Sequence, residues 1–418
     1  MITATHCSQC PRLSAETPLS VGPALSHEAF AAIRQSLLLD HCKWDPQVED
    51  RSTLAPFPLI MSTTCWARLA KDAEELAAQT IRAEEYLLTT PHLWPIIGVP
   101  RKLRRALAQV SRLGPTPAAV RVMRFDFHFT TTGWRISEVN SDVPGGYCES
   151  SSFTRLIAAH FPALHTAGDP AQTWVDAMAR LRSGPIALLC APGFMEDQQV
   201  VSYLAQRLRV HGCDAILSEP RQLRWHDGHA HLNDTRLSSI VRFYQAEWLC
   251  RLPRRCGWTN FIAGGKTPVT NPGAAILSES KRFPLAWSHL PFDPSAWRRL
   301  LPETRDPRNA PWQTDDSWLI KSAYCNTGDT VTIRQLTDAT RWRSAARAAR
   351  WHPGQWLAQK RFETVPLSSP IGQIYPCIGI YVINGVAAGA YGRVSPTPVI
   401  DFSATDVALL LNPKAADE

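Results

Sequence analysis

Long hydrophobic runs are missing from this sequence of 418 residues. A membrane-spanning helix needs roughly 18 consecutive apolar residues, whereas the segment 185–194 is typical of the longest apolar stretches here. The first 13 residues also lack the charged start and apolar core of a signal peptide. The eleven cysteines are scattered and odd in number, and the Cys7-x-x-Cys10 pair has no second pair to complete a zinc site. We therefore expect a cytoplasmic protein with free thiols and no membrane partner.

Charge is also sparse. Charged residues make up 19% of the chain and apolar residues 44%, which excludes disorder of the whole chain and predicts a large core. The net charge of +7 comes from 36 arginines and only eight lysines against 37 acidic residues. The basic clusters, such as 101–105 and 251–255, are short and lie near acidic residues, so we interpret them as solvated faces. We expect no nucleic-acid partner, although a positive surface favours anionic small molecules such as nucleotides.

Common catalytic signatures are absent as well. The segment 264–267 resembles the end of a phosphate-binding P-loop, but Asn260 stands where that motif needs its first glycine. No Gly-x-Ser-x-Gly sequence occurs, and Cys148 has no histidine close to it in sequence. We therefore expect no covalent nucleophile.

The order of apolar and polar residues predicts an α/β chain of two or three domains. Helical periodicity marks residues 67–89, and a strand–helix–strand order begins at residue 186. From residue 276 onward, expected strands alternate with one helix rich in Arg and Ala at 339–350. We divide the chain into residues 1–175, 176–275 and 276–418. The expected strands of the last part are 318–322, 331–334, 356–359, 379–383 and 387–391.

The most informative segment is a predicted β-hairpin over residues 121–140. Both flanks alternate in the manner of strands, and Gly133 ends the short loop between them. A register centred on Thr132 gives three cross-strand pairs, unless a bulge at Gly133 shifts it by one: Asp126 with Glu138, Arg124 with Asn140, and His128 with Ile136. One face then carries Arg124, Asp126, Glu138 and Asn140, and the other carries Phe125, Phe127 and Phe129.

The polar face of this hairpin has two interpretations. Two carboxylates that face each other repel unless a positive charge lies between them. Asp126, Glu138 and the Asn140 amide form an all-oxygen set that suits Mg²⁺, which usually arrives with nucleotide phosphates. The alternative is a solvent-facing hairpin on which Arg124 simply pairs with the two carboxylates.

Lysines are rare enough to be informative. Lys321 ends the apolar strand 318–322 just before the polar loop 324–330, where an ammonium could reach phosphate oxygens as a point charge. The alternative is a lysine that extends from an edge strand to solvent. Lys281 is a similar but weaker candidate.

Taken in order, these segments resemble the glutathionylspermidine synthase-like, circularly permuted ATP-grasp ligases. The metal set precedes the lysines, which reverses the order of an ordinary ATP-grasp protein, as a permutation would. The resemblance covers most of residues 120–400. It rests on the following segments: Arg124-Phe-Asp126, Glu138-Val-Asn140-Ser-Asp142, Lys281, Trp318-Leu-Ile-Lys321, Trp356 to Phe362, and Gly379 to Arg393.

This resemblance implies an α/β ATP-grasp fold with circular permutation and a pre-ATP-grasp-like subdomain. Residues 1–175 would hold helices and the metal-binding half, 176–275 the subdomain, and 276–418 the lysine and hinge half. Asp126, Glu138 and Asn140 would bind Mg²⁺ against the ATP phosphates, and Arg124 would contact the γ-phosphate. The other implied ATP contacts are Lys281 and Lys321 at the phosphates, Gln359, Lys360, Arg361 and Phe362 at the adenine hinge, and Arg393 near the phosphates. The candidate substrate-binding residues are His128, Asp142, Glu149, Ser150 and Ser151.

The activity implied is an ATP-dependent ligation of a small-molecule carboxylate to an amine through an acyl phosphate, with release of ADP and phosphate. We expect the synthetase part alone, without the amidase domain of bifunctional members. The stretch 141–147 differs from the synthase pattern, so glutathione is not implied as the substrate, and an amino acid or ammonia could be the amine. A rival interpretation is an ATP-binding scaffold without catalysis, but such a homologue should have lost at least one of the charged residues above.

Overall fold

The structure is a computed structural model that describes residues 17–48, 51–181, 184–324, 328 and 330–414. The Cys7-x-x-Cys10 pair and residues 325–327 and 329 of the candidate phosphate loop lie outside the described residues. The α-helices are α1 (His27–Asp40), α2 (Thr63–Leu88), α3 (Arg101–Leu107), α4 (Val110–Leu113), α5 (Thr154–Ala158), α6 (Pro170–Ala179), α7 (Met195–Val210), α8 (Ala246–Leu249), α9 (Ile276–Glu279), α10 (Ser295–Leu300) and α11 (Ala339–Trp351). Among them, no helix is both long and apolar enough to cross a membrane.

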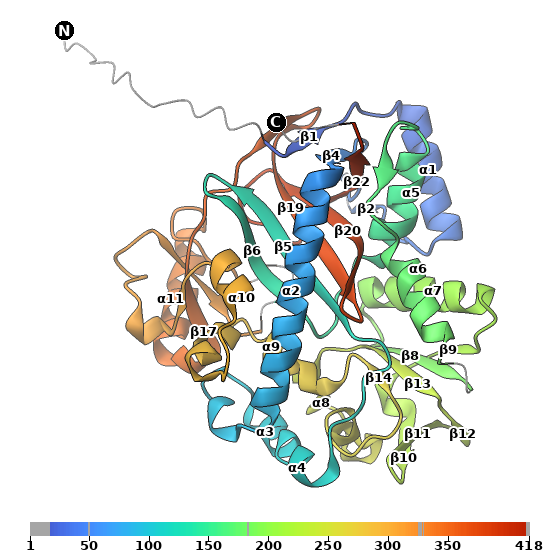
Figure 1. The fold of residues 1–418 in the computed structure, drawn as a ribbon, viewed down its shortest axis with the longest axis vertical. Helices are drawn as coiled ribbons and strands as arrows, with labels where there is room; N and C mark the ends of the chain where they lie inside the picture. Colours follow the sequence, from blue (N-terminus) through green and yellow to red (C-terminus); the bar gives the residue numbers. More distant parts are fainter. Residues whose placement is uncertain (1–16, 49–50, 182–183, 325–327, 329, 415–418) are drawn as a thin grey trace.

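A six-stranded sheet joins two hairpins that are far apart in sequence (Figure 1). The predicted hairpin pairs through its first strand with a second hairpin that turns at Gly385, and all of these pairs are antiparallel. The strands of this sheet are β21 (Thr405–Val407), β20 (Val386–Ser395), β19 (Gly372–Ile383), β5 (Val122–Thr130) and β6 (Gly133–Asn140), with β18 (Leu367–Ser369) paired to β19. Residues 122–140 and 372–407 therefore form one sheet.

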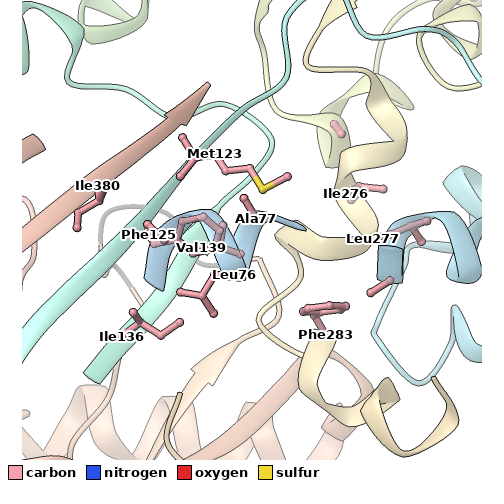
Figure 2. Close-up of a cluster of buried hydrophobic side chains, with 14 of the residues drawn as sticks. Leu76, Ala77, Met123, Phe125, Ile136, Val139, Ile276, Leu277, Phe283 and Ile380 are labelled. Carbon is pink, nitrogen blue, oxygen red and sulfur yellow. The ribbon is translucent and has the colours of Figure 1, made fainter. Parts of the chain in front are cut away.

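The long helix α2 lies across one face of this sheet (Figure 1). Ser62 caps its N-terminus, because the side chain accepts a hydrogen bond from the Cys65 N–H group. Its buried side chains recur at spacings of three and four residues, which places them on one side of the helix. Leu76 and Ala77 of this stripe belong to the same buried cluster as Phe125 (Figure 2). The apolar face of the predicted hairpin is therefore core, as expected.

The predicted strand–helix–strand unit is present as a four-stranded sheet. The strand expected from residue 186 is β8 (Ile186–Cys190), the helix that follows is α7, and the next strand of the unit is β9 (Ala215–Ser218). All neighbouring pairs are parallel. In order across the sheet, the strands are β14 (Val269–Thr270), β13 (Ser239–Phe243), β8 (Ile186–Cys190) and β9 (Ala215–Ser218).

A three-stranded sheet carries the lysine and hinge segments, and α11 packs beside it. Its strands are β15 (Thr304–Arg305), β17 (Trp356–Lys360) and β16 (Trp318–Ser322). The expected strand 331–334 is wrong: Thr332 makes a single bridge to Ile320, and a turn begins at Ile333. The amide of Leu336 donates to the Ile333 carbonyl at 3.0 Å, so the chain turns before it can extend the ladder.

The remaining strands form smaller sheets. A four-stranded sheet brings the chain's last strand beside its first ones (Figure 1), in the order β1 (Leu19–Val21), β4 (Leu59–Ser62), β22 (Leu409–Asn412) and β7 (His165–Thr166). The others are β10 (Leu223–His226) with β11 (His229–Leu232) and β12 (Thr235–Arg236), and β2 (Gln47–Val48) with β3 (Arg51–Ser52). The division of the chain at residues 175 and 275 stays a prediction.

Candidate functional site

The polar face of the β5–β6 hairpin forms part of the wall of a cavity of about 370 Å³. Arg124, Asp126, Glu138 and Asn140 all line it. The register pairs Arg124 with Asn140 and Asp126 with Glu138, so both of these predicted pairs are confirmed. The hairpin thus presents its charged side chains to a hollow rather than to open solvent.

Arg124 and Asp126 form a two-point ion pair on this face. Nε and Nη2 of Arg124 donate to Oδ1 and Oδ2 of Asp126 at 2.8 and 3.0 Å, and Nη1 donates to the carbonyl of Gly145 at 2.8 Å. Burial alone would raise the pKa of Asp126, but the guanidinium outweighs burial and holds that pKa below its ordinary value. The carboxylate is therefore ionised and its orientation is fixed.

Gly379 leaves room for this ion pair. It pairs with Asp126 from the neighbouring strand β19. A Cβ atom at this position would lie 2.7 Å from Cδ of Arg124 and 3.0 Å from Oδ1 of Asp126. Any larger residue would therefore displace the charged side chains.

The hairpin register shifts between Asp126 and Phe127, opposite Ser137, and not at Gly133. His128 consequently pairs with Arg135, so its predicted pairing with Ile136 is wrong. The physical reason is the core: the extra residue places the fully buried Ile136 beside Phe127 and leaves Ser137 at the cavity. The Ser137 hydroxyl then lies 3.1 Å from Nε2 of His128. Burial lowers the pKa of His128 to about 4, which leaves the ring neutral at pH 7.

The two candidate lysines both reach strand β6. Nζ of Lys321 donates to the Ser137 carbonyl at 3.0 Å, and Lys321 lines the cavity although only 3% of it is exposed. Nζ of Lys281 donates to the Val139 carbonyl at 3.0 Å and lies 3.4 Å from Oε2 of Glu138. Lys281 lines a smaller void beside the main cavity, together with Lys321 and Glu138. Both ammonium groups are therefore held against strand β6, and neither extends into solvent.

The predicted hinge residues divide between the two sides of β17. Gln359, Arg361 and Phe362 line the cavity. Lys360 lies on the opposite side, where its Nζ donates to Oγ of Ser317 at 2.7 Å and lies 4.9 Å from the centre of the Trp318 ring. Alternation along the strand explains why Gln359 and Lys360, its last two residues, differ; Arg361 and Phe362 follow the end of the strand. The N–H groups of Lys360 and Arg361 donate to the carbonyls of Glu303 and Ser317, both at 2.8 Å, so these two donors are already used within the protein.

Some of the candidate substrate-binding residues line the cavity and others do not. His128 and Glu149 line the cavity, as does Arg393. Asp142, Ser150 and Ser151 are absent from its wall. The Asp142 carboxylate is buried in an ion pair with Arg242 and accepts from the Ala246 N–H group at 2.7 Å. Ser150 donates to the Tyr147 carbonyl and Ser151 accepts from the Ala171 N–H group, at 3.3 and 3.0 Å. These three residues support the wall from behind.

Sequence reasoning missed one part of the cavity wall. Lys43, Asp45, Tyr391 and Asp406 line it as well. Lys43 could have been found by the scarcity of lysine, the same signal that selected Lys321. The other three carry no local pattern that distinguishes them from surface residues.

The donor set fits a hard divalent cation. Nδ2 of Asn140 donates to Oδ2 of Asp126 at 3.1 Å, which turns the amide oxygen away from the carboxylate and leaves it available as a ligand. A carboxylate oxygen that accepts one hydrogen bond retains a second lone pair. Among the described residues, no three His, Cys, Asp or Glu side chains gather as a metal site; the predicted set has two carboxylates and one amide. Carboxylate and amide oxygens are what Mg²⁺ accepts.

Comparison with known proteins agrees with this geometry. The glutathionylspermidine synthase preATP-grasp family matches residues 59–411, which is most of the chain. The chain belongs to this family. It is therefore a member of a family of ATP-grasp-like carboxylate–amine ligases.

A solved structure shares this fold. The glutathione synthetase-like effector GSS30 from Globodera pallida, in its apo form, superposes with a TM-score of 0.62 at 11% identity and covers 92% of this chain and 96% of its own. A protein from Methylobacillus flagellatus KT, provisionally named a gamma-glutamylcysteine synthetase, gives a TM-score of 0.41 at 12% identity over 75% of this chain and 84% of its own. No curated protein sequence matches this chain.

Proposed function

We propose that the protein is an ATP-dependent carboxylate–amine ligase that forms an amide bond through an acyl phosphate and releases ADP and phosphate. One observation carries this proposal. A single cavity combines the hairpin's Arg124, Asp126 and Glu138 with Lys321 and Gln359, which come from the other half of the chain. Cations and carboxylates arranged around one hollow are what the transfer of a phosphoryl group needs.

The proposed reaction has two steps. A carboxylate oxygen of the first substrate attacks the γ-phosphorus of ATP, the bond to the β–γ bridging oxygen breaks, and ADP leaves behind an acyl phosphate. The neutral amine of the second substrate then attacks the acyl carbon. The bond from that carbon to the phosphate oxygen breaks, the nitrogen loses a proton, and an amide and inorganic phosphate result.

The charged residues have separate roles in this scheme. The Arg124 guanidinium and the Lys321 ammonium neutralise the negative charge that grows on the transferring phosphoryl group. Asp126, Glu138 and Asn140 would hold Mg²⁺, which supplies further charge neutralisation when it is bound. Gln359, Arg361 and Phe362 would contact the adenosine side of the nucleotide, and Phe362 is held by His128, whose ring centre is 5.2 Å away.

Calorimetry and product analysis test the proposal. ATP should bind only weakly without Mg²⁺ and more tightly with it. Pools of small carboxylates supplied with ATP, Mg²⁺ and hydroxylamine should then yield ADP and a hydroxamate, because hydroxylamine can replace the amine. Tight ATP binding with no ADP from any pool would instead favour the scaffold interpretation.

A further inference from the structure

Lys43 is a buried lysine at one end of the cavity, which we call the acidic end because Asp45, Glu149 and Asp406 surround the ammonium there. Its Nζ lies 2.6 Å from Oε1 of Glu149, 3.0 Å from Oδ1 of Asp45 and 3.7 Å from Oδ2 of Asp406. Only 7% of Lys43 is exposed. Burial alone would lower its pKa, but Glu149, Asp406 and Asp45 together raise that pKa well above the ordinary value. The side chain is therefore a permanent cation.

The backbone around Lys43 is fixed from two sides. Its N–H group donates to the Leu37 carbonyl at the end of α1, at 3.0 Å. The next two N–H groups, of Trp44 and Asp45, donate to Oε1 of Gln199 on α7 at 2.6 and 3.3 Å. Gln199 is itself buried. The main chain that carries the Lys43 side chain is thus fixed independently of the ion pairs of its ammonium.

The acidic end lies one side chain away from the proposed phosphate site. The Arg124 guanidinium lies 5.0 Å from the centre of the Tyr391 ring, and the Tyr391 hydroxyl donates to Oδ1 of Asp406 at 2.7 Å. An amine that attacks an acyl phosphate next to Arg124 would therefore approach from the side of Asp406.

The charges at this end nearly cancel. Asp45, Glu149 and Asp406 contribute three negative charges, whereas Lys43 and Arg393, whose Nε lies 4.0 Å from Asp406, contribute two positive charges. The balance is 3 − 2 = 1 negative charge, which one substrate ammonium neutralises. Glu196 and Asp197 also line the cavity from the first turn of α7. Glu196 is exposed at the rim, and burial raises the pKa of Asp197 to about 7, so Asp197 carries only part of a negative charge near neutral pH.

We infer that Lys43 is an internal counter-cation that selects the amine substrate. Its tethered ammonium occupies the place that a second charge of a diamine or polyamine would take. The amine substrate is therefore one with a single ammonium group, such as a simple monoamine or the amino group of an amino acid. This inference rests on the proposed function for the identity of the cavity, but its test measures binding and needs no turnover.

The test compares propylamine, 1,4-diaminobutane and spermidine by calorimetry and by thermal shift. Wild-type protein should bind the diamine and the polyamine no more tightly than the monoamine. In Lys43→Met, the ratio of the affinity for the diamine to that for the monoamine should rise about tenfold or more. The buried carboxylates then lack the Lys43 ammonium, and the second ammonium of the diamine can pair with them. Lys43→Arg, which keeps the charge, should behave like wild type. Lys102→Met removes an exposed lysine on α3 and is the matched control, with no change expected.

Two results would overturn the inference. The first is that wild-type protein binds the diamine or the polyamine about tenfold more tightly than the monoamine, and that Glu149→Gln abolishes this difference. A factor of this size is what one buried ion pair contributes to affinity. The other is a Lys43→Met protein with the wild-type unfolding midpoint and no gain in preference for the diamine. If Lys43→Met does not fold, the affinities of wild-type and Lys43→Arg protein for the three amines test the inference. Equal affinity of both proteins for all three amines supports it. Mg²⁺-dependent ATP binding, measured on the same samples, reports separately on the proposed function.

Discussion

At the scale of single residues, the hairpin's carboxylates differ in what holds them. Asp126 is bound at both oxygens by Arg124, whereas Glu138 lies at the longer distance of 3.4 Å from Nζ of Lys281. Glu138 is therefore the carboxylate that can most easily turn toward a cation. Its substitution should affect the metal site and leave the buried ion pair intact.

Glu138→Gln should abolish turnover and leave the fold intact. Glutamine keeps the size of the side chain, but it removes the negative charge that a divalent cation requires. Steady-state assays with circular dichroism as the folding control measure this. Glu303→Gln, at an exposed carboxylate that pairs with Arg305, is the matched control. Turnover of Glu138→Gln at the wild-type rate would show that the metal assignment is wrong.

Lys321→Met should weaken ATP binding by about 1.5–3 kcal/mol, the scale of a hydrogen bond to a charged group. The methionine replaces the buried part of the side chain, so the unfolding temperature should change little. Isothermal calorimetry measures the loss, with Lys102→Met, at an exposed lysine on α3, as the control. Equal ATP affinity in Lys321→Met and wild type would return Lys321 to a purely structural role.

Glu247 gives a prediction that depends on pH. Burial and the nearby Asp142 raise its pKa to about 7, and its Oε2 is buried without a hydrogen-bond partner. Because the folded state holds this proton more tightly than the unfolded state, stability should fall as pH rises between about 4.5 and 7. Glu247→Gln removes this dependence and should be more stable than wild type by up to about 3 kcal/mol at pH 8, with little difference at pH 4.5.

Urea unfolding of both proteins at the two pH values measures this difference. An equal difference in stability at pH 4.5 and pH 8 would contradict the assignment, because the effect would then not come from a titrating carboxyl group.

At the scale of elements, the site depends on how closely β19 approaches β5. Gly379→Ala should keep the strand, but its Cβ would push Arg124 and Asp126 out of their ion pair. We expect ATP-dependent activity to fall steeply with a small loss of stability. Gly354→Ala is the control, because a Cβ at that position meets no atom within 4 Å. Full activity in Gly379→Ala would mean that the ion pair need not occupy this position.

The positions of several strands could be predicted from the sequence alone. Alternation predicted β5, and apolar runs predicted β8 and β16, each to within a residue or two, because each strand is buried on at least one face. Alternation could not locate the bulge opposite Ser137, which is decided by whether Ile136 or Ser137 enters the core. It also failed at 331–334, where four residues with strand composition are interrupted by a turn at Ile333.

At the scale of the whole molecule, the cavity exists because distant parts of the chain share sheets. Asp126 pairs with Gly379, and Leu409 pairs with Leu59, so residues near both ends of the chain are neighbours. Local sequence pattern contains no information on such pairs. The scarcity of lysine pointed to Lys321 and the resemblance to a family pointed to Gln359, but the acidic end around Lys43 and Asp406 became visible only when the chain was folded.

The central claim is that a carboxylate is activated by phosphoryl transfer, and one isotope measurement tests it most directly. A carboxylate substrate labelled with oxygen-18 is incubated with the protein, ATP, Mg²⁺ and hydroxylamine, and the products are separated by mass. An acyl phosphate leaves one carboxylate oxygen on the phosphate when the amine displaces it. We predict ADP as the nucleotide product and one oxygen-18 atom in inorganic phosphate. AMP as the nucleotide product, with oxygen-18 in AMP and none in inorganic phosphate, would contradict the account.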